Sequence, residues 1–529
     1  MNLVQDPWLP FQLRDGRVLT LPMSAIGRAD IIDFALPRAD FQGAAYQFAI
    51  GLLQTVFAPE DEIAWHEYFE QAPTEDELNL AFDKVQHAFN LCGDGPLFMQ
   101  DYEPIENGSL KSISNLLIET PGENGIKDNK DHFIKRGMCD VMSLEMAALA
   151  LFTLQLNGPP NKACKGGRVG IRGAGPLTTL ITTSTEKSSL WNKLWLNVMN
   201  IDYLKWREPN YHDGSVFPWL VPTISSAPVG KVSKEIYEHD VHPLYVYWAM
   251  PNRIRLNFVE GEYECAITGK KATSATMDYF IVGYGNNYTG HWNHPLTPYQ
   301  YNDKEDTYSS IKGSSDSITY RFWDGIVFTD NINKLRCAKV VNHFYRVLPL
   351  FIESINQVPN LWVFSYDLDK ARVDGWYSSS MPLFPVPLEK QDEILREIKQ
   401  LQTLCNNALL HCRSQIKAAW FDKPGDTKVD TSFIDTAFWQ RSEAAFFTAV
   451  AVLIPHAQCP PEVAKTWLQA LRNICVDLFD EYALSELANA RSMAKRIQAR
   501  QALVGWLYGG KEIKAFMVNH QIDVKKEIA

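Results

Sequence analysis

Two histidines and several cysteines are the residues whose side chains could hold a metal ion. His291 and His294 are three positions apart in the segment GHWNHPLTPY, and Cys265 precedes them. A structural zinc site needs four protein ligands, and a catalytic site needs three and a water molecule. The nine cysteines are scattered and form no CxxC pair, so a zinc site built from cysteines has no support in the sequence. We therefore interpret the two histidines as residues that fix a loop.

The sequence predicts no catalytic residue. It contains no GxSxG, no HExxH, no Walker A motif and no GxGxxG after a predicted strand. Glu389, Glu393 and Glu397 share one face of a predicted helix, and this pattern is typical of a solvated helix surface. A metal-dependent nuclease that uses His291, His294 and an acidic partner stays open as the enzymatic alternative.

Two polar loops carry basic residues that could bind phosphate. Glycine lets a backbone approach a groove closely, and lysine and arginine neutralise phosphate charge. Contact with nucleic acid and a merely solvated loop both stay open, because glycine and lysine are common on surfaces. The residues are Lys127, Lys130, Phe133, Lys135 and Arg136 in the loop at 119–140, and Lys162, Lys165, Gly166, Gly167, Arg168 and Arg172 in the loop at 157–176.

Length and composition indicate a folded protein with an acidic surface. The chain has 529 residues, 46% of them hydrophobic, with 51 basic against 62 acidic side chains and a net charge of −11. This charge argues against non-specific coating of nucleic acid, which depends on lysine and arginine, but it permits a local basic site. No apolar run is long enough to span a membrane, and no signal peptide is visible. Unpaired cysteines favour a reduced, cytoplasmic protein.

The elements that would position these loops follow from periodicity and from turn residues. Residues 1–25 predict a β-hairpin around Asp15-Gly16. Helices are expected at 40–56, with Asp40 as a possible N-cap, at 74–91, where Thr74 and Glu77 form a capping box, and at 143–156. Short strand-like runs follow between 215 and 385, among them LYVYWAM, RIRLNFV, MDYFIVGY, SITYRFWDGIVF and LWVFSY.

The pattern becomes helical after the segment PLFPVP at 382–387. Amphipathic stretches at 388–421, 431–454, 460–487 and 484–508 predict four antiparallel helices with short links, which is a bundle. The expected domains are therefore residues 1–384 and 385–529.

A series of short segments is also found, in the same order, in a known protein family. They are MNLVQDPWLPF at the start, PLFMQ (96–100), RGAGPLTTL (172–180), GHWNHPLTP (290–298), FWQRSE (438–443) and LANAR (487–491). On these segments the chain resembles the large subunit of the type I-E CRISPR surveillance complex Cascade, the CasA family, nearly end to end.

The resemblance implies an α+β fold, with a large mixed α/β N-terminal domain of unusual topology and a C-terminal four-helix bundle. It implies no catalysis and no cofactor. Its expected partners are the other Cascade subunits with their crRNA, target double-stranded DNA, and an effector helicase-nuclease that it recruits. The expected role is to recognise a protospacer-adjacent motif in the duplex, largely from the minor groove, whose code is degenerate. A side-chain wedge then helps to open the duplex, and contacts to the opened strands stabilise the R-loop.

Candidate nucleic-acid contacts follow residue by residue from the resemblance. The family's long loop corresponds to 119–140, its glycine-rich minor-groove loop to 162–168, and its wedge hairpin to 366–370, while basic residues gather on the last bundle helix. Some relatives bind zinc through paired cysteines, but Cys139 and Cys265 lack such partners, so no metal is predicted. The candidates are Phe133, Lys135, Arg136, Lys165, Gly166, Gly167, Arg168, Asp369, Lys370, Arg491, Lys495, Arg496 and Arg500. A structural scaffold that never touches DNA stays open as a second alternative.

Overall fold

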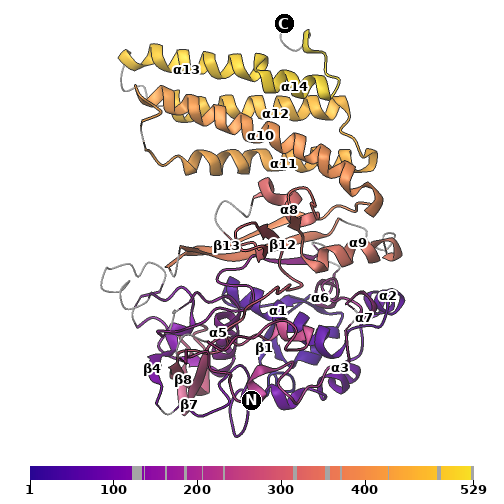
Figure 1. Ribbon diagram of the computed structural model, residues 1–529, viewed down its shortest axis with the longest axis vertical. Helices are drawn as coiled ribbons and strands as arrows, with labels where there is room; N and C mark the ends of the chain where they lie inside the picture. The colour runs from indigo at the N-terminus through magenta and orange to yellow at the C-terminus, as the bar shows by residue number, and fades with distance from the viewer. Residues whose placement is uncertain are drawn as a thin grey trace. The chain divides into compact units, whose positions relative to one another are not determined.

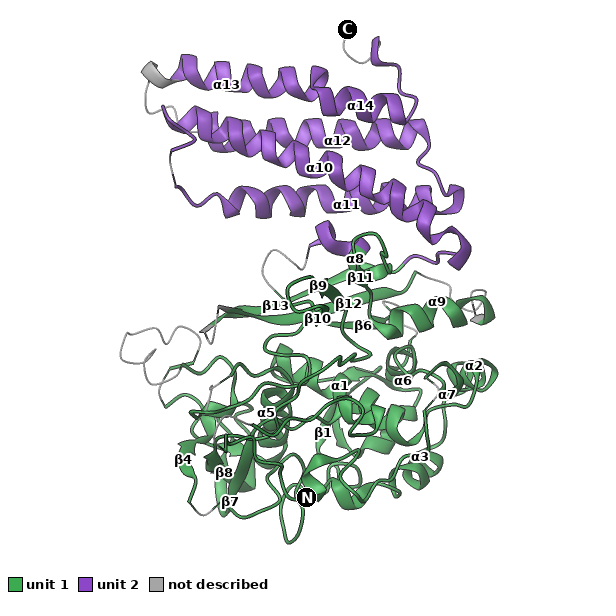
Figure 2. Ribbon diagram, in the orientation of Figure 1, with its two compact units in different colours: residues 1–318, 325–383 green, residues 319–324, 384–529 purple. Residues whose placement is uncertain are grey.

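The computed structural model describes most of the chain, which divides into two compact units (Figures 1 and 2). Unit 1 comprises residues 1–318 and 325–383, and unit 2 comprises residues 319–324 and 384–529. The long part of unit 2 begins beside the predicted boundary at 385, whereas the segment 319–324 was not predicted to belong there. Residues not described are 106, 122–133, 136, 161–163, 184–187, 205, 230–232, 314–318, 352–357, 370–371, 427, 485–489 and 526–529, together with the side chains of 351, 369, 372 and 490–492.

The N-terminal hairpin and the first helix form as predicted. Strands β1 (Leu9–Leu13) and β2 (Val18–Leu21) pair across a turn in which Gly16 has φ +88°, and β3 (Ile31–Phe34) completes the sheet in the order β2-β1-β3. Helix α1 (Ala39–Val56) is buried along nearly its whole length and packs on α5 (Leu144–Asn157). Arg38, and not Asp40, occupies the N-cap position, because the Asp40 carboxylate lies in the first turn and binds the Arg38 side chain.

Helix α3 (Glu75–Phe82) has the predicted capping box between Thr74 and Glu77, but it ends earlier than expected. The chain beyond it turns back onto the N-terminus, where the Leu3 N–H donates to the Phe89 carbonyl and the Leu91 N–H donates to the Met1 carbonyl, each at 2.9 Å. These backbone bonds replace the helical bonds that the sequence pattern favoured.

The described residues of unit 1 form three further sheets, two of which hold the candidate loops (Figure 1). The long strands β7 (Arg253–Glu264) and β8 (Lys271–Val282) form an antiparallel hairpin, with β4 (Ser109–Ser112) and β5 (Met142–Ser143) on the other edge of β8. Strands β12 (Asn360–Asp369) and β13 (Arg372–Pro382) form a second hairpin beside β6 (Thr178–Thr182). The third sheet joins β9 (Tyr299–Asn302), β10 (Thr307–Ser310) and β11 (Leu335–Arg336).

Two predicted strands are wrong. LYVYWAM forms the 3-10 turn Pro243–Tyr247, and SITYRFWDGIVF forms the 3-10 turn Tyr320–Phe322 followed by α8 (Trp323–Val327). Both runs are rich in large aromatic side chains that the fold buries, among them Tyr245 and Trp323. A fully buried run shows no alternation of apolar and polar residues, so its period cannot separate strand from helix.

The remaining helices of unit 1 surround an aromatic core. They are α2 (Glu62–Glu70), α6 (Leu190–Trp195), α7 (Ile201–Leu204) and α9 (Lys339–Phe351). The rings of Trp191 and Trp195 stack at 4.8 Å, and those of Trp65 and Trp195 at 6.4 Å. Stacked and edge-on aromatic pairs add to the hydrophobic free energy of burial, which holds these short helices in place.

Unit 2 is the predicted helical bundle with one extra helix. Helices α10 (Gln391–Trp420), α11 (Ser432–His456), α12 (Pro461–Phe479) and α13 (Ala490–Gly509) pack side by side (Figure 1), and a five-residue π-helix, Asp480–Leu484, extends α12. The predicted α+β fold with a helical C-terminal region is confirmed. The additional α14 (Lys511–Asn519) was missed, because Gly509-Gly510 favoured an end to helical structure there.

The motif FWQRSE explains why the segment 319–324 belongs to unit 2. The Tyr320 hydroxyl lies 2.7 Å from Ser442 Oγ and 2.8 Å from Cys405 Sγ, and its ring lies edge-on to Trp439. Arg441, from the same motif, donates to Glu481 at 2.5 Å. The motif therefore fixes the segment and the π-helix to the bundle.

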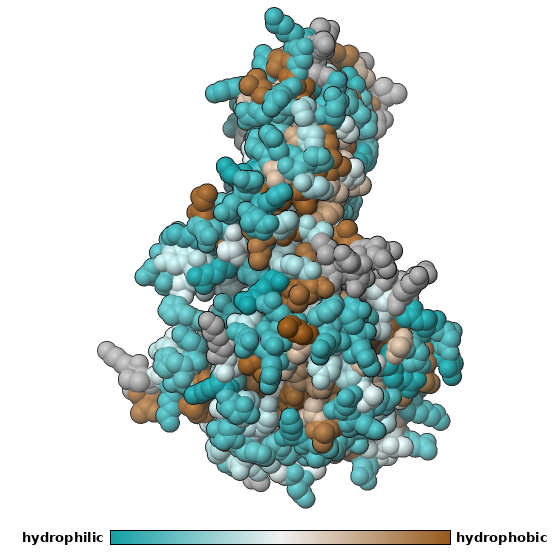
Figure 3. Space-filling view, turned by 90° about the vertical axis from the view of Figure 1, so that its right-hand side faces the viewer, coloured by the Kyte–Doolittle hydropathy of each residue, from teal (hydrophilic) through white to brown (hydrophobic). Residues whose placement is uncertain are grey.

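Among the described residues, no helix is both long and apolar enough to cross a bilayer. The face drawn in Figure 3 is mostly hydrophilic, and its hydrophobic residues lie in small scattered groups.

Candidate nucleic-acid interface

A partly buried ion-pair network holds the beginning of the long loop 119–140. Arg38 lies 2.9 Å from the Asp40 carboxylate and 2.8 Å from that of Glu119, and the Tyr366 hydroxyl on β12 donates to Asp40. Asp40 is 3% exposed. Burial alone would lower the pKa of Arg38, but its hydrogen bonds and attraction to Asp40 and Glu119 outweigh burial and raise that pKa. The start of α1, the start of the loop and the β12–β13 hairpin thus share one network.

The tip of the β7–β8 hairpin holds the other end of this loop. The Ala266 N–H donates to the Val141 carbonyl at 2.9 Å, and the Cys265 N–H donates to the Lys270 carbonyl at 2.9 Å across a turn in which Gly269 has φ +64°. Lys270 and Lys271 are exposed beside this junction. Sequence reasoning missed them, although two lysines after a Thr-Gly turn between strand-like runs could have indicated a basic hairpin tip.

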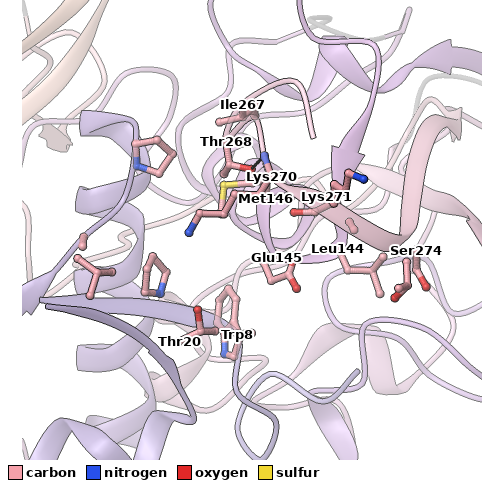
Figure 4. A pocket seen from close by; sticks show the side chains of 17 residues that line it. Trp8, Thr20, Leu144, Glu145, Met146, Ile267, Thr268, Lys270, Lys271 and Ser274 are labelled. Atoms are coloured by element: carbon pink, nitrogen blue, oxygen red, sulfur yellow. Dashed lines mark hydrogen bonds between the residues drawn. The ribbon is translucent and has the colours of Figure 1, made fainter. Parts of the chain in front are cut away.

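A cavity of about 560 Å³ opens between this hairpin tip, the start of α5 and the N-terminal hairpin (Figure 4). Figure 4 shows Thr268 and Lys270 on one side, Glu145 and Met146 from α5 in the centre, and Trp8 and Thr20 from the N-terminal segment facing them. The cavity is therefore lined by apolar residues together with polar and basic ones, next to the end of the long loop.

The glycine-rich loop lies on the opposite end of β8. The Tyr284 N–H donates to the Gly166 carbonyl at 2.8 Å, and a Cβ at Gly283 would stand 2.3 Å from the Lys165 carbonyl oxygen. Gly166 has φ +79°, and a Cβ there would stand 3.1 Å from the Tyr284 ring. Glycine at 166 is thus required by the fold of the loop itself. β8 has 12 residues, which at about 3.3 Å each separate this loop from Lys271 by roughly 40 Å.

The two basic side chains described in the glycine-rich loop, Lys165 and Arg168, differ in their exposure to solvent. Lys165 is exposed. The Arg168 guanidinium donates to Ser226 Oγ at 2.8 Å and to the Ser226 carbonyl at 3.2 Å, and it lies 5.8 Å from the centre of the Tyr284 ring. Arg168 therefore holds the loop onto its neighbours, whereas Lys165 is presented to solvent.

Several candidates fall in or beside residues that are not described. Phe133, Arg136 and Lys370 lie outside the described residues, and Asp369 is described only by its backbone, which pairs with Arg372 at the end of β12. Lys135 is exposed. The fold thus joins the long loop and the β12–β13 hairpin through the Arg38 network, and places the glycine-rich loop at the other end of β8 from Lys271.

The basic residues of α13 are held by acidic or carbonyl groups of unit 2. Lys495 Nζ lies 2.6 Å from Asp422 Oδ1, Arg500 forms two bonds to Asp480 at 2.6 and 2.8 Å, and Arg496 donates to the Ala483 carbonyl at 3.0 Å. The Arg491 side chain is not described. Because the Asp422 side chain is 98% exposed, water and salt weaken its ion pair, and a phosphate could replace it at Lys495.

The two histidines of GHWNHPLTP do fix a loop, as predicted. His294 is buried. Its ring Nδ1 accepts from the Leu296 backbone N–H at 3.1 Å, and its backbone N–H donates to the Tyr299 hydroxyl at 2.8 Å. His291 is exposed and lies 2.5 Å from Thr307 Oγ1. Within the part of the chain that the structure describes, no three His, Cys, Asp or Glu side chains come close enough to hold a metal ion.

Solved structures of similar fold come from CRISPR systems. A CRISPR-associated protein from Thermus thermophilus matches with a TM-score of 0.68 at 16% identity, covering 96% of this chain and 99% of that one. Cse1 from Thermobifida fusca matches with a TM-score of 0.67 at 16% identity, covering 97% and 98%. A chain of a CRISPR RNA-guided surveillance complex matches with a TM-score of 0.64 at 14% identity, covering 95% and 99%. A comparison with curated protein sequences finds no match.

The family assignment rests on a match between this chain and the sequence pattern of one protein family. The pattern of CRISPR-associated protein Cse1 matches residues 2–478, which is most of unit 1 and the bundle through α12. The Thermus thermophilus and Thermobifida fusca structures share this fold over nearly their full length. The chain therefore belongs to the Cse1 family of CRISPR-associated proteins, the large subunit of type I-E Cascade.

Proposed function

We propose that the chain is a non-catalytic subunit of a crRNA-guided complex and that it recognises a protospacer-adjacent motif in target duplex DNA. Support comes from the Cse1 family membership and from a similar chain that belongs to an RNA-guided surveillance complex. Base pairing with the guide RNA reads the long target sequence in such complexes, so the protein needs to read only a short duplex tag.

The observation that carries this proposal is the basic hairpin tip beside the long loop. Lys270 and Lys271 are exposed, and the backbone bond from Ala266 to Val141 fixes them next to the end of the loop. A rigid turn that carries two lysines can approach phosphates on both sides of a groove. Because the whole chain has a net charge of −11, binding is expected only where such basic groups are concentrated.

The glycine-rich loop is proposed to meet the same duplex at the minor groove. Lys165 is its exposed cation, and Gly167 lies in the turn that the Gly167 N–H closes onto the Cys164 carbonyl at 3.2 Å. A separation of roughly 40 Å along β8 is close to one turn of B-DNA, about 34–36 Å. The two ends of β8 are therefore expected to contact one face of the duplex about one turn apart.

The wedge hairpin and the bundle are assigned to the later steps. Asp369 and Lys370, at the end of the hairpin, are proposed to stand where the strands separate, at a cost of a few kcal/mol for each unstacked step. Phe133, Lys135 and Arg136 of the long loop, and Arg491, Lys495, Arg496 and Arg500 of α13, are proposed to contact the opened strands. Recruitment of an effector helicase-nuclease is proposed for the assembled complex.

The test is binding of tagged duplex DNA by the assembled complex with single charge reversals at the hairpin tip. Lys270→Glu or Lys271→Glu is expected to raise the dissociation constant about tenfold near 0.15 M salt and to reduce the slope of log K against log salt by about 1 for each phosphate that the variant no longer neutralises. Gly167→Asp places a carboxylate in the glycine-rich loop and is expected to weaken binding at least as much. The readout is a filter or anisotropy titration at several salt concentrations.

Lys84→Glu is the matched control for these substitutions. Lys84 is also exposed in unit 1 but lies next to α3, away from the β7–β8 hairpin, so its reversal changes net charge equally without touching the proposed interface. If Lys84→Glu weakens binding as strongly as Lys270→Glu, or if Lys270→Glu, Lys271→Glu and Gly167→Asp all bind like the unmodified protein, the proposal is wrong.

A further inference from the structure

One face of the small sheet β9–β10–β11 in unit 1 (Figure 2) gathers aromatic and basic side chains. The register sets Tyr301 opposite Tyr308 and Arg336 opposite Tyr299. Residues directly opposite in an antiparallel pair point to the same side of the sheet. Since Tyr299 and Tyr301 are two positions apart on β9, they share this side too, so all four side chains lie on one face.

Contacts on this face align the rings and the cations. The Tyr301 and Tyr308 rings meet edge-on at 5.2 Å, the Arg336 guanidinium carbon lies 3.5 Å from the centre of the Tyr308 ring, and Lys334 Nζ lies 4.2 Å from the centre of the Tyr301 ring. Tyr299 is buried, while Tyr301 and Tyr308 are half-buried and Arg336 is exposed. The guanidinium plane is therefore held against one ring.

The polar side chains of this face differ in whether they already form a hydrogen bond or an ion pair. Lys334 binds Asp303 at 2.7 Å, and the Tyr301 hydroxyl donates to Asp306. The Arg336 side chain, by contrast, forms no hydrogen bond or ion pair with any described residue beyond its stacking on Tyr308. Its five N–H donors are thus available at the edge of a plane that is already held in place.

A cavity of about 280 Å³ opens above this face, lined by Tyr301, Tyr308 and Arg336 from the sheet and by His291, Trp292 and Asn293 from the preceding loop. This volume is just below the range of about 300–1,000 Å³ for pockets that hold drug-sized ligands. It therefore suits one planar group with its attached phosphate, and not a large ligand.

We propose that this face is a stacking site for one unpaired nucleotide of a nucleic-acid strand. The base stacks on the outer plane of the Arg336 guanidinium, whose inner plane lies on Tyr308, and the N–H groups at the edge of the guanidinium donate to the neighbouring phosphate. Proteins that bind single strands use aromatic rings and arginine planes in this way, often on a sheet surface. The inference rests on the proposed function, because opening a duplex supplies the unpaired strand.

The test uses the full isolated chain and a labelled ten-nucleotide thymidine strand, compared with a strand of the same backbone that lacks its bases at the central positions. Arg336→Ala is expected to raise the dissociation constant for the normal strand about tenfold, which is within the range for loss of one stacked base. The strand without central bases should bind the unmodified chain about as weakly as the normal strand binds Arg336→Ala. For Arg336→Ala itself, the two strands should have nearly the same dissociation constant. Tyr308→Ala is expected to act like Arg336→Ala, because it removes the ring that holds the guanidinium.

Two controls separate stacking from charge. Arg336→Lys keeps the charge but loses the plane, so most of the affinity should still be lost. Lys304→Ala removes a cation from the adjoining exposed turn of the same sheet and is expected to change the dissociation constant less than twofold. Circular dichroism spectra and unfolding curves like those of the unmodified chain show that the variants are folded.

Three results would overturn the inference. They are equal binding of the normal and base-free strands, an effect of Lys304→Ala as large as that of Arg336→Ala, and displacement of the strand by an acidic peptide with the same dependence on Arg336, which would indicate a protein carboxylate as ligand. Because this experiment uses the isolated chain and an unpaired strand, its outcome does not depend on whether the assembled complex recognises a duplex tag. Failure of the proposed function and failure of this inference are thus distinguishable.

Discussion

Replacing Asp40 by alanine is expected to lower the free energy of unfolding by about 3 kcal/mol, because it removes a buried carboxylate that accepts hydrogen bonds from both Arg38 and Tyr366. Asp40 is 3% exposed and binds both Nε and Nη2 of Arg38, each at 2.9 Å. Its loss would leave the Tyr366 hydroxyl without its acceptor and the Arg38 guanidinium with Glu119 as its remaining carboxylate. Chemical unfolding of the full chain, followed by tryptophan fluorescence, measures the change.

The chain contains its own matched control for this substitution. Arg28 and Asp30 have the same spacing as Arg38 and Asp40 and the same pair of bonds, at 3.0 and 2.8 Å, but Asp30 is 49% exposed. An exposed pair is worth at most about 1 kcal/mol, so Asp30→Ala is expected to have a small effect. Equal losses of stability in the two variants would contradict the structural role of the network.

Weakening the Arg38 network should also affect the proposed interface. Glu119 begins the long loop and Tyr366 lies on the wedge hairpin, so Asp40→Ala loosens both at once. We therefore expect weaker binding of tagged duplex by the assembled complex with Asp40→Ala, and unchanged binding with Asp30→Ala.

Lowering the pH from 7.5 to 5 is expected to remove about 4 kcal/mol from the free energy of unfolding, at about 1.4 kcal/mol for each pKa unit. His343 and His294 are buried in unit 1. Burial, followed by the nearby Arg346, lowers the pKa of His343 to about 3, and burial together with Arg172 and Lys339 lowers that of His294 far below its usual value. In the unfolded chain both titrate near pH 6.5.

The sign follows from proton uptake by the two states. Below pH 6.5 the unfolded chain binds a proton at each histidine while the folded chain does not, so stability falls as the pH drops from 6.5 towards 3. At pH 5 each histidine accounts for about 2 kcal/mol, since one pKa unit corresponds to about 1.4 kcal/mol. Urea unfolding at pH 7.5, 6 and 5 measures this dependence.

His343→Gln isolates one of the two contributions. His343 Nε2 lies 2.8 Å from Asn200 Oδ1, and glutamine retains a polar group but cannot titrate. Its stability is expected to change with pH by about half as much as that of the unmodified chain, whatever its stability at pH 7.5. A flat stability between pH 7.5 and 5, or an unchanged pH dependence in His343→Gln, would contradict the buried neutral histidines.

Where the structure describes them, the segments that identified the family in the sequence are mostly buried and hold the fold together. Arg172 is 3% exposed and donates to Gln47 Oε1 at 2.8 Å, to Thr178 Oγ1 at 2.9 Å and to Thr297 Oγ1 at 3.2 Å. RGAGPLTTL and GHWNHPLTP are thus joined through one guanidinium. Segments held by such internal contacts mark the fold and not the proposed DNA-binding surface.

The candidate interface was less predictable for the opposite reason. Lys270 and Lys271 are exposed, and an exposed lysine leaves no periodic signal in the sequence. Their importance depends on the bond from Ala266 to Val141, which joins positions far apart in the chain. Likewise, the stacking of Arg336 on Tyr308 depends on strands β10 and β11 both pairing with β9, and the short run at 335–336 is too brief to be read as a strand.

Local sequence patterns predicted the structure best at positions where a single turn or helix cap determines the backbone conformation. The turn at Gly16 in the first hairpin and the capping box at Thr74 were predicted correctly. The same signals failed where tertiary contacts prevailed, as at Phe89, where the chain pairs with the N-terminus instead of continuing a helix.

The most direct test of the proposed role is discrimination between tagged and untagged duplex DNA by purified complexes assembled with and without this chain. With the chain present, the dissociation constant for the tagged duplex should be at least about tenfold lower, as expected for one or two good base-edge contacts. Without the chain, the two duplexes should bind alike. A complex that lacks the chain and still prefers the tagged duplex by the same ratio would contradict the account, as would cleavage of DNA by the chain alone.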